Sequence, residues 1–180
     1  EYDVDTDHST LDFRIQSALI DARGAFYDWK GTANIPDDGN LNQLTGEITV
    51  DVGSVDTRVR KRDNHLRSSD FFDVAEYPDA TFVVTDSLLA AEDTLMLTGE
   101  LTIKGVTQEL QVPMTIVHNA PERLRLQGTF PVQRRQFGLL YDSAVNPIDD
   151  VASVSVDLNF MRREAPAEAE APSEETPGDL

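Results

Sequence analysis

Apolar and polar residues alternate along most of the chain, which is the pattern of β-strands that bury one face. About eight segments show it, at residues 11–18, 25–35, 44–52, 81–88, 95–103, 110–116, 124–132 and 154–160. Several neighbours are separated by short polar turns, and short connections imply antiparallel pairing. Strands with one apolar face need a sandwich or a closed barrel to cover it. The pattern therefore predicts an all-β fold.

One internal segment breaks the alternation. Between Thr57 and Ser69, the residues Val59, Asp63 and Leu66 recur at helical spacing. Asp56 or Thr57 could cap the first turn, because short polar side chains accept hydrogen bonds from the free N–H groups there. We expect a short helix inserted between strands, covering one end of a barrel.

The C-terminal stretch has a different composition. From residue 163 onward it consists mainly of Ala, Pro, Glu and Ser. Such a sequence cannot bury enough apolar surface to fold. We predict one folded domain over residues 1–162 and a disordered acidic tail over residues 163–180.

Composition narrows the functional classes. The chain has 180 residues, no cysteine and a net charge of −18. The missing cysteines exclude disulfides, thiolate catalysis and cysteine metal sites. The strong acidity disfavours binding to nucleic acids and to acidic membrane surfaces. No run approaches the roughly 18 apolar residues of a membrane-spanning helix.

The acidity has two interpretations. It could be an adaptation to high salt, where screening weakens repulsion between carboxylates. It could equally be an ordinary acidic surface. The N-terminal residues are already polar, so the chain is expected to be cytoplasmic or a mature form whose leader has been removed.

Several short motifs recur in a characteristic order. They are YDVDTDHS at 2–9, Gly24-Ala25-Phe26, RDNHL at 62–66, DFFD at 70–73, Tyr77-Pro78, TGELTIKGVT at 98–107, and Arg134 with Phe137-Gly138. In this order and spacing, they resemble the YceI-like family over roughly residues 2–160. Gln16-Ser17 departs from an expected basic pair, and Gln136 from an expected aspartate.

The resemblance implies an eight-stranded antiparallel, lipocalin-like barrel with an elongated apolar lumen. It also implies a long-chain lipid ligand such as a polyisoprenoid, a quinone or a related amphiphile. Because the family is often exported, the resemblance implies a periplasmic or secreted location. We expect no cofactor, and a homodimer is left open.

The lumen has two interpretations as well. Gly31, Gly46, Gly99 and Gly128 fall on the inward phase of four strands. Glycines there could leave open volume for a ligand, or could only let a tight barrel coil; the family resemblance favours the cavity. The predicted lining residues, which could equally form a plain core, are Phe13, Ile15, Tyr27, Trp29, Phe82, Val84, Leu97, Leu101, Met114, Phe130, Val156 and Leu158.

Two polar residues are candidates for contacting a lipid head group. Arg134 continues an inward phase at a strand end, where it could meet a diphosphate or a quinone carbonyl. The alternative is a rim salt bridge to Asp5, Asp149 or Asp150. His8 is the second candidate, near a barrel end.

Catalytic and metal sites are weakly supported. His8, His65 and His118 lie in different contexts and show no ligand spacing, so we predict no metal site. No base is marked beside Ser9, Asp12 is an isolated acid on a strand, and Asp149-Asp150 reads as a solvated turn. We therefore expect a lipid carrier or store rather than an enzyme. A structural or stress-response barrel without a tight ligand is the main alternative, and a lipid-modifying enzyme is a weaker one.

Overall fold

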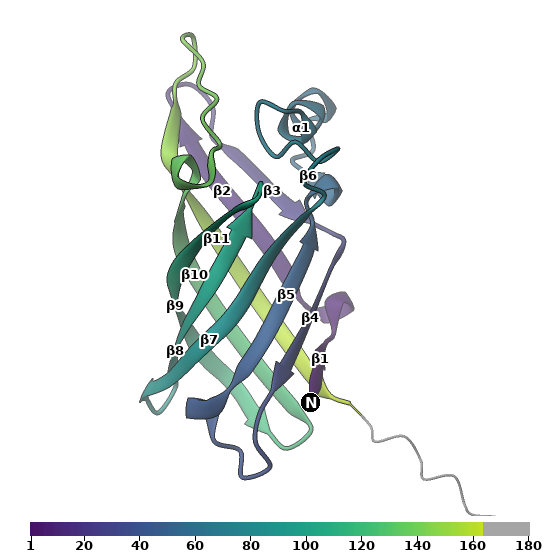
Figure 1. Cartoon of the computed structure of the whole chain (residues 1–180), viewed down its shortest axis with the longest axis vertical. Coiled ribbons are helices and arrows are strands. Elements are labelled where there is room, and N and C mark those ends of the chain that lie inside the picture. Colours follow the sequence, from purple (N-terminus) through teal and green to yellow (C-terminus); the bar gives the residue numbers. More distant parts are fainter. Residues whose placement is uncertain (164–180) are drawn as a thin grey trace, which may run out of the picture.

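Long antiparallel strands wind around a common axis in the computed structural model, which describes residues 1–163 (Figure 1). The strands are β1 (Tyr2–Val4), β2 (Thr10–Ser17), β3 (Ala22–Phe26), β4 (Trp29–Asn34), β5 (Thr45–Asp51), β6 (Val55–Asp56), β7 (Asp79–Ala91), β8 (Thr94–Ile103), β9 (Val106–Ala120), β10 (Arg123–Gln133) and β11 (Ile148–Arg162). The helix is α1 (Arg60–Arg67), and short 3-10 turns are η1 (Thr6–His8), η2 (Leu41–Gln43), η3 (Val52–Ser54) and η4 (Arg134–Phe137).

The strands close into a barrel. Neighbours follow the order β1-β4-β5-β7-β8-β9-β10-β11, and β11 pairs back onto β1. β2, β3 and β6 continue the positions of β1, β4 and β5 toward the other end, since β11 pairs with β1 through Phe160 and with β2 through Val154. This confirms the predicted eight-stranded antiparallel barrel.

One end of the barrel is filled by its own side chains. Leu95 and Leu124 are fully buried there, and Leu124 pairs with Phe160, which in turn pairs with Val4 of β1. Apolar residues at every second position place this core inside and leave polar residues outside. The packed end lies near the N-terminus, whereas α1 stands over the opposite end (Figure 1).

Neighbouring side chains occupy the space beside two of the inward glycines. A Cβ at Gly99 would lie 2.6 Å from the Phe82 ring and 2.6 Å from the Val83 carbonyl oxygen. A Cβ at Gly128 would lie 2.5 Å from the Met114 sulfur. Here the glycines permit close packing, as in the coiled-barrel interpretation. They do not themselves open a cavity.

We expect Gly99→Ala to lower the free energy of unfolding by about 1–3 kcal/mol, because the added methyl group overpacks a site bounded by backbone. Chemical denaturation of the purified variant measures this. Glu100→Ala, at the neighbouring exposed position, is the matched control. Equal stability of the two variants would show that the strand can shift to accommodate a side chain at Gly99.

The helical insertion is present but starts later than predicted. α1 begins at Arg60, after Val59, and no side chain caps it. Neither Asp56 nor Thr57 caps it, because both lie too far upstream. Instead the buried Asp63 carboxylate accepts hydrogen bonds from the backbone N–H and hydroxyl group of Thr57, at 2.8 and 2.5 Å. A side chain of the helix therefore stabilises the preceding loop, whereas no side chain of that loop caps the helix.

The described residues run to Arg163, one position past the predicted domain boundary. The backbone N–H of Arg163 donates to the Glu1 carbonyl at 2.9 Å, and its guanidinium binds the Glu1 and Asp3 carboxylates. The remainder of the predicted tail, 164–180, lies outside the described residues. Within residues 1–163, no helix is long and apolar enough to cross a membrane.

Candidate functional site

An apolar cavity of about 220 Å³ lies inside the barrel. Side chains from strands around the barrel surround it, together with Phe72 from the segment before β7. Nearly all of them are apolar. Most of the predicted lining residues are among them: Phe13, Phe82, Val84, Leu97, Leu101, Met114, Phe130, Val156 and Leu158. We call this cavity the lumen.

A second cavity, of about 350 Å³, adjoins the lumen at the α1 end. It lies between the α1 segment and the loops 18–21 and 138–147, and Ile15 lines this cavity rather than the lumen. Phe13, Phe72, Arg134, Leu139 and Ala152 border both cavities. The two cavities therefore adjoin each other, and we call the outer one the vestibule.

Besides Ile15, two predicted lining residues do not border the lumen. The side chain of Tyr27 is 69% exposed, so the prediction that it points inward is wrong. β3 ends at Phe26 and β4 starts at Trp29, so the turn between them shifts the alternation by one residue. Phe26 faces the lumen instead, while Trp29 is buried in the core without lining the cavity.

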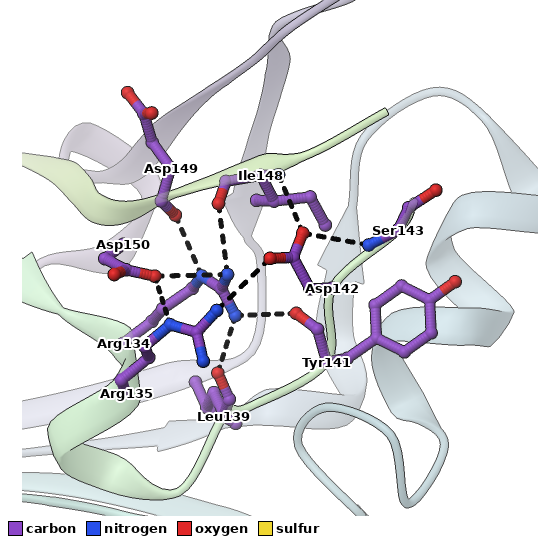
Figure 2. A network of polar contacts seen from close by, with 9 residues as sticks. All are labelled: Arg134, Arg135, Leu139, Tyr141, Asp142, Ser143, Ile148, Asp149 and Asp150. Carbon is purple, nitrogen blue, oxygen red and sulfur yellow. Dashed lines mark hydrogen bonds and ion pairs between the residues drawn. The ribbon is translucent and has the colours of Figure 1, made fainter. Parts of the chain in front are cut away.

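Arg134 is buried and binds backbone carbonyl groups, as Figure 2 shows. Its guanidinium donates to the carbonyl oxygens of Leu139 and Tyr141, both at 2.7 Å. It also donates to those of Asp149 and Ile148, at 2.8 and 3.1 Å.

The Asp150 carboxylate, 3.3 Å from Nη2 of Arg134, completes these contacts. Four donations to carbonyl groups and this ion pair thus engage every nitrogen of the guanidinium within this loop. The Asp150 contact matches the predicted rim salt bridge, and because Arg134 also borders both cavities, its head-group role stays a prediction. Asp150 supplies the ion pair, Asp149 only a carbonyl group, and Asp5 no contact.

The surroundings of Arg134 shift two pKa values. Burial, followed by the nearby charge of Arg135, lowers the pKa of Arg134. Backbone N–H groups of Ile148 and Ser143 donate to Asp142 and lower the pKa of its carboxyl group. Arg135 binds Asp150 and, at 3.2 Å, Asp142 (Figure 2). These contacts hold the loop 138–147 over the end of the lumen.

His8 is not a lumen residue. It lies in η1, its ring is largely exposed, and Nδ1 is 2.8 Å from the Asp5 carboxylate. η1 lies on the side of the barrel between β1 and β2, where the His8 carbonyl accepts a hydrogen bond from the Asn159 side chain of β11 (Figure 1). The head-group prediction for His8 is wrong, because His8 borders neither the lumen nor the vestibule.

Further polar side chains that could meet a head group lie beside Arg134 in the wall of the vestibule. They include Arg62 and His65 of α1, Tyr141 and Asn146. The His65 ring packs edge-on against Tyr141, with centroids 4.6 Å apart, and its Nε2 is 2.8 Å from the Asp70 carboxylate. Arg62 and His65 belong to the RDNHL motif, but only the fold brings them beside the loop 138–147.

The described residues show no arrangement typical of a metal or hydrolytic site. Within residues 1–163, no three His, Asp or Glu side chains come together to hold an ion. The Ser9 hydroxyl donates to the Asp5 carbonyl and accepts from the Asn159 N–H, so it stabilises the turn between β1 and β2. The chemistry that this site supports best is apolar binding with a polar rim.

Comparison with known proteins places the chain in a family. A model described as a YceI-like domain matches residues 2–160. The chain belongs to the YceI-like family. The resemblance predicted from its motifs is thereby confirmed.

Relatives named Protein YceI occur in Salmonella newport (strain SL254) and Salmonella arizonae (strain ATCC BAA-731 / CDC346-86 / RSK2980). Each is 40% identical over 111 residues, which cover 60% of this chain and 57% of the relative. The match therefore spans a little over half the length of these curated YceI proteins.

Solved structures share the barrel. BcnA of Burkholderia cenocepacia superposes with a TM-score of 0.79 at 25% identity, over 87% of this chain and 98% of BcnA. The Campylobacter jejuni YCEI protein gives 0.73 at 22% identity, over 81% and 88% of the two chains. A polyisoprenoid binding domain from Saccharophagus degradans gives 0.71 at 17% identity, over 90% and 98%. These similarities confirm the YceI-type barrel fold.

Proposed function

We propose that this protein binds a long apolar lipid, a polyisoprenoid or an isoprenoid quinone, and carries or stores it without chemical change. The observation that carries the proposal is the lumen itself, an apolar cavity that is packed at one end and adjoins a mostly apolar vestibule with a few polar side chains at the other. Burial of apolar surface stabilises such a complex by about 25 cal/mol per Å² with little demand for directional contacts. The polyisoprenoid-binding domain of the same fold supports this choice of ligand.

The shape of the space assigns the two parts of the ligand. The lumen alone, at about 220 Å³, is below the range of about 300–1,000 Å³ common for ligand sites. The vestibule adds about 350 Å³, and the two volumes together fall within that range. We assign the isoprenoid chain to the lumen and the head group to the vestibule, beside Arg62, His65 and Tyr141.

Arg62 and His65 have the chemistry for this role. Nε and Nη2 of Arg62 donate to Thr57, at 2.8 and 3.0 Å, which leaves Nη1 without a protein acceptor in the described part of the chain. A guanidinium held in this way is a ready donor to a carbonyl or phosphate oxygen. His65 offers its second ring nitrogen on the same wall.

A barrel without a tight ligand is the second candidate. The observation that favours it is the packing of Phe82 over Gly99 and of Met114 over Gly128, which narrows the lumen. A ligand would have to move these side chains or pass beside them. Methionine and phenylalanine side chains rotate at modest energetic cost, so this packing does not by itself keep a lipid out. The two candidate functions differ in whether a lipid enters the lumen.

A quinone titration distinguishes these two functions. Trp29, the single tryptophan, is buried in the barrel core, so its fluorescence reports a quinone inside the barrel. We expect a polyisoprenoid quinone to quench it in a saturable manner near one equivalent. A benzoquinone without the isoprenoid chain is the control and should give only weak, unsaturated quenching. Equal behaviour of the two compounds would contradict apolar binding in the lumen.

Location follows from the family resemblance as a further part of the proposal. We propose that the protein acts in the periplasm or outside the cell, where a lipid carrier would move its cargo between membranes or hold it in reserve. Fractionation of the producing cells tests this. Recovery of the protein in the cytoplasmic fraction would contradict a location in the periplasm or outside the cell.

A further inference from the structure

We propose that the rim of the vestibule is a membrane-docking surface that settles on an anionic lipid bilayer. The surface comprises the tips of the loops 18–21 and 138–147 and the exposed basic side chains at the start of α1. The inference rests on the proposed function for its purpose, since a lipid must pass between bilayer and lumen. Its evidence comes from exposure and charge.

The loop tips expose large apolar side chains. Leu19 and Ile20 are 69% and 68% exposed, and Val145 is 81% exposed. The two loops lie side by side, because the Leu19 N–H donates to the Asn146 side chain at 2.8 Å and the Ala18 N–H donates to the Pro147 carbonyl at 3.0 Å. Scattered exposed hydrophobics need no explanation, but a cluster at the entrance of an apolar cavity indicates an interaction site.

The segment 58–67 carries a local excess of basic residues. Five basic residues and a single acid lie between Arg58 and Arg67, in a chain whose net charge is −18. The acid, Asp63, is buried against Thr57. Arg58, Arg60 and Lys61 are exposed, and their side chains form no ion pair within residues 1–163.

The acidity of the rest of the molecule does not cancel this patch. Charges farther away than about 8–10 Å are largely screened at physiological ionic strength. On the apolar loops nearby, the carboxylates of Asp21 and Asp142 are paired with Arg14 and Arg135. Asp56 and Asp70 place exposed carboxylates beside the patch, the first bonded to the Arg58 N–H and the second paired with His65. The basic character is therefore confined to the side chains of Arg58, Arg60 and Lys61, within a chain that is acidic as a whole.

The arrangement fits a bilayer in particular. Apolar side chains at the tips of two loops, with basic side chains beside them, match the acyl boundary and anionic head groups of a membrane interface. The α1 segment and both loops stand at the same end of the barrel (Figure 1), and the vestibule opens between them. Docking in this orientation would let an isoprenoid chain enter the lumen without crossing water.

Co-sedimentation with vesicles tests the proposal. The full chain is mixed with vesicles of phosphatidylcholine alone, or of phosphatidylcholine with phosphatidylglycerol. We expect binding to the mixed vesicles and a loss of binding as salt is raised. Each basic residue near such a surface strengthens binding by about fivefold, so Arg60→Gln with Lys61→Gln should weaken it by about 25-fold. Leu19→Ser with Val145→Ser should weaken it by about tenfold.

Matched variants far from the surface provide the controls. Lys30→Gln removes an exposed positive charge from the barrel wall, and Leu88→Ser removes a leucine that is 57% exposed near the other end of β7. Neither should change vesicle binding. Absence of binding to the mixed vesicles at low salt, or equal losses in control and test variants, would overturn the proposal.

Two further measurements distinguish membrane docking from lipid binding in the lumen and from self-association. Quinone uptake from solution should be unchanged in the Leu19/Val145 double variant, since neither residue borders the lumen or the vestibule. Uptake without vesicle binding would refute docking alone, whereas vesicle binding without uptake would refute lipid binding in the lumen. Sedimentation velocity without lipid checks self-association; a dimer that Leu19→Ser dissociates would assign the surface to a second copy and overturn the proposal.

Discussion

Replacement of Arg134 by methionine is expected to lower the free energy of unfolding by about 3–5 kcal/mol. Methionine fills a similar volume but donates no hydrogen bond. The carbonyl groups of Leu139, Tyr141, Ile148 and Asp149 would lose their donor, and each buried group left unsatisfied costs about 1–3 kcal/mol before the loop relaxes. Chemical denaturation at neutral pH measures the loss.

The neighbouring arginine provides the control for this variant. Arg135→Gln removes two ion pairs between exposed side chains, which contribute little in water. Its unfolding midpoint should stay close to that of the parent chain. Arg134→Lys, which keeps the charge but loses donors, should have a midpoint between those of the parent chain and Arg134→Met. An Arg134→Met protein as stable as Arg135→Gln would contradict the role assigned to Arg134.

The second large effect concerns the lumen. Val84→Phe is expected to raise the Kd for a polyisoprenoid quinone by about tenfold or more while the barrel stays folded. Val84 borders the lumen and pairs with two glycines, Gly46 and Gly99. An added ring would therefore extend into the space of the ligand. Excluding about 55 Å² of lipid surface, at about 25 cal/mol per Å², corresponds to a tenfold change in Kd.

The adjacent residue on the same strand is the matched control. Val83 points outward and is 38% exposed, so Val83→Phe adds the same atoms outside the barrel. The Trp29 titration should give the parent Kd for Val83→Phe and a weaker one for Val84→Phe. Parent-like affinity in both variants would place the ligand outside the lumen.

The barrel was predictable because strand alternation is a local signal. Residues such as Leu95 and Leu97 are two apart, so their shared face follows from strand geometry alone. The prediction failed where the chain bends. Nothing in the sequence between Phe26 and Trp29 marks the residue that ends one strand and starts the next, and this one-residue shift turns Tyr27 outward.

The candidate site was harder to predict, because its polar contacts join distant segments. The acceptors of Arg134 are carbonyl groups, which every residue has, so their identity depends on the path of the loop 138–147. The same holds for the vestibule, where His65 meets Tyr141 across the fold. The inward phase of Gly99 and Gly128 was visible, but whether Phe82 and Met114 fill the space is a matter of packing.

Native mass spectrometry of the protein purified without detergent tests the central claim most directly. The account predicts a species heavier than the 20.0 kDa chain, by the mass of one lipid. Organic extraction should release a compound with the mass ladder of isoprene units. A bare chain that also takes up no added polyisoprenoid quinone would contradict lipid binding in the lumen, and would leave the barrel as a structural protein filled by its own side chains.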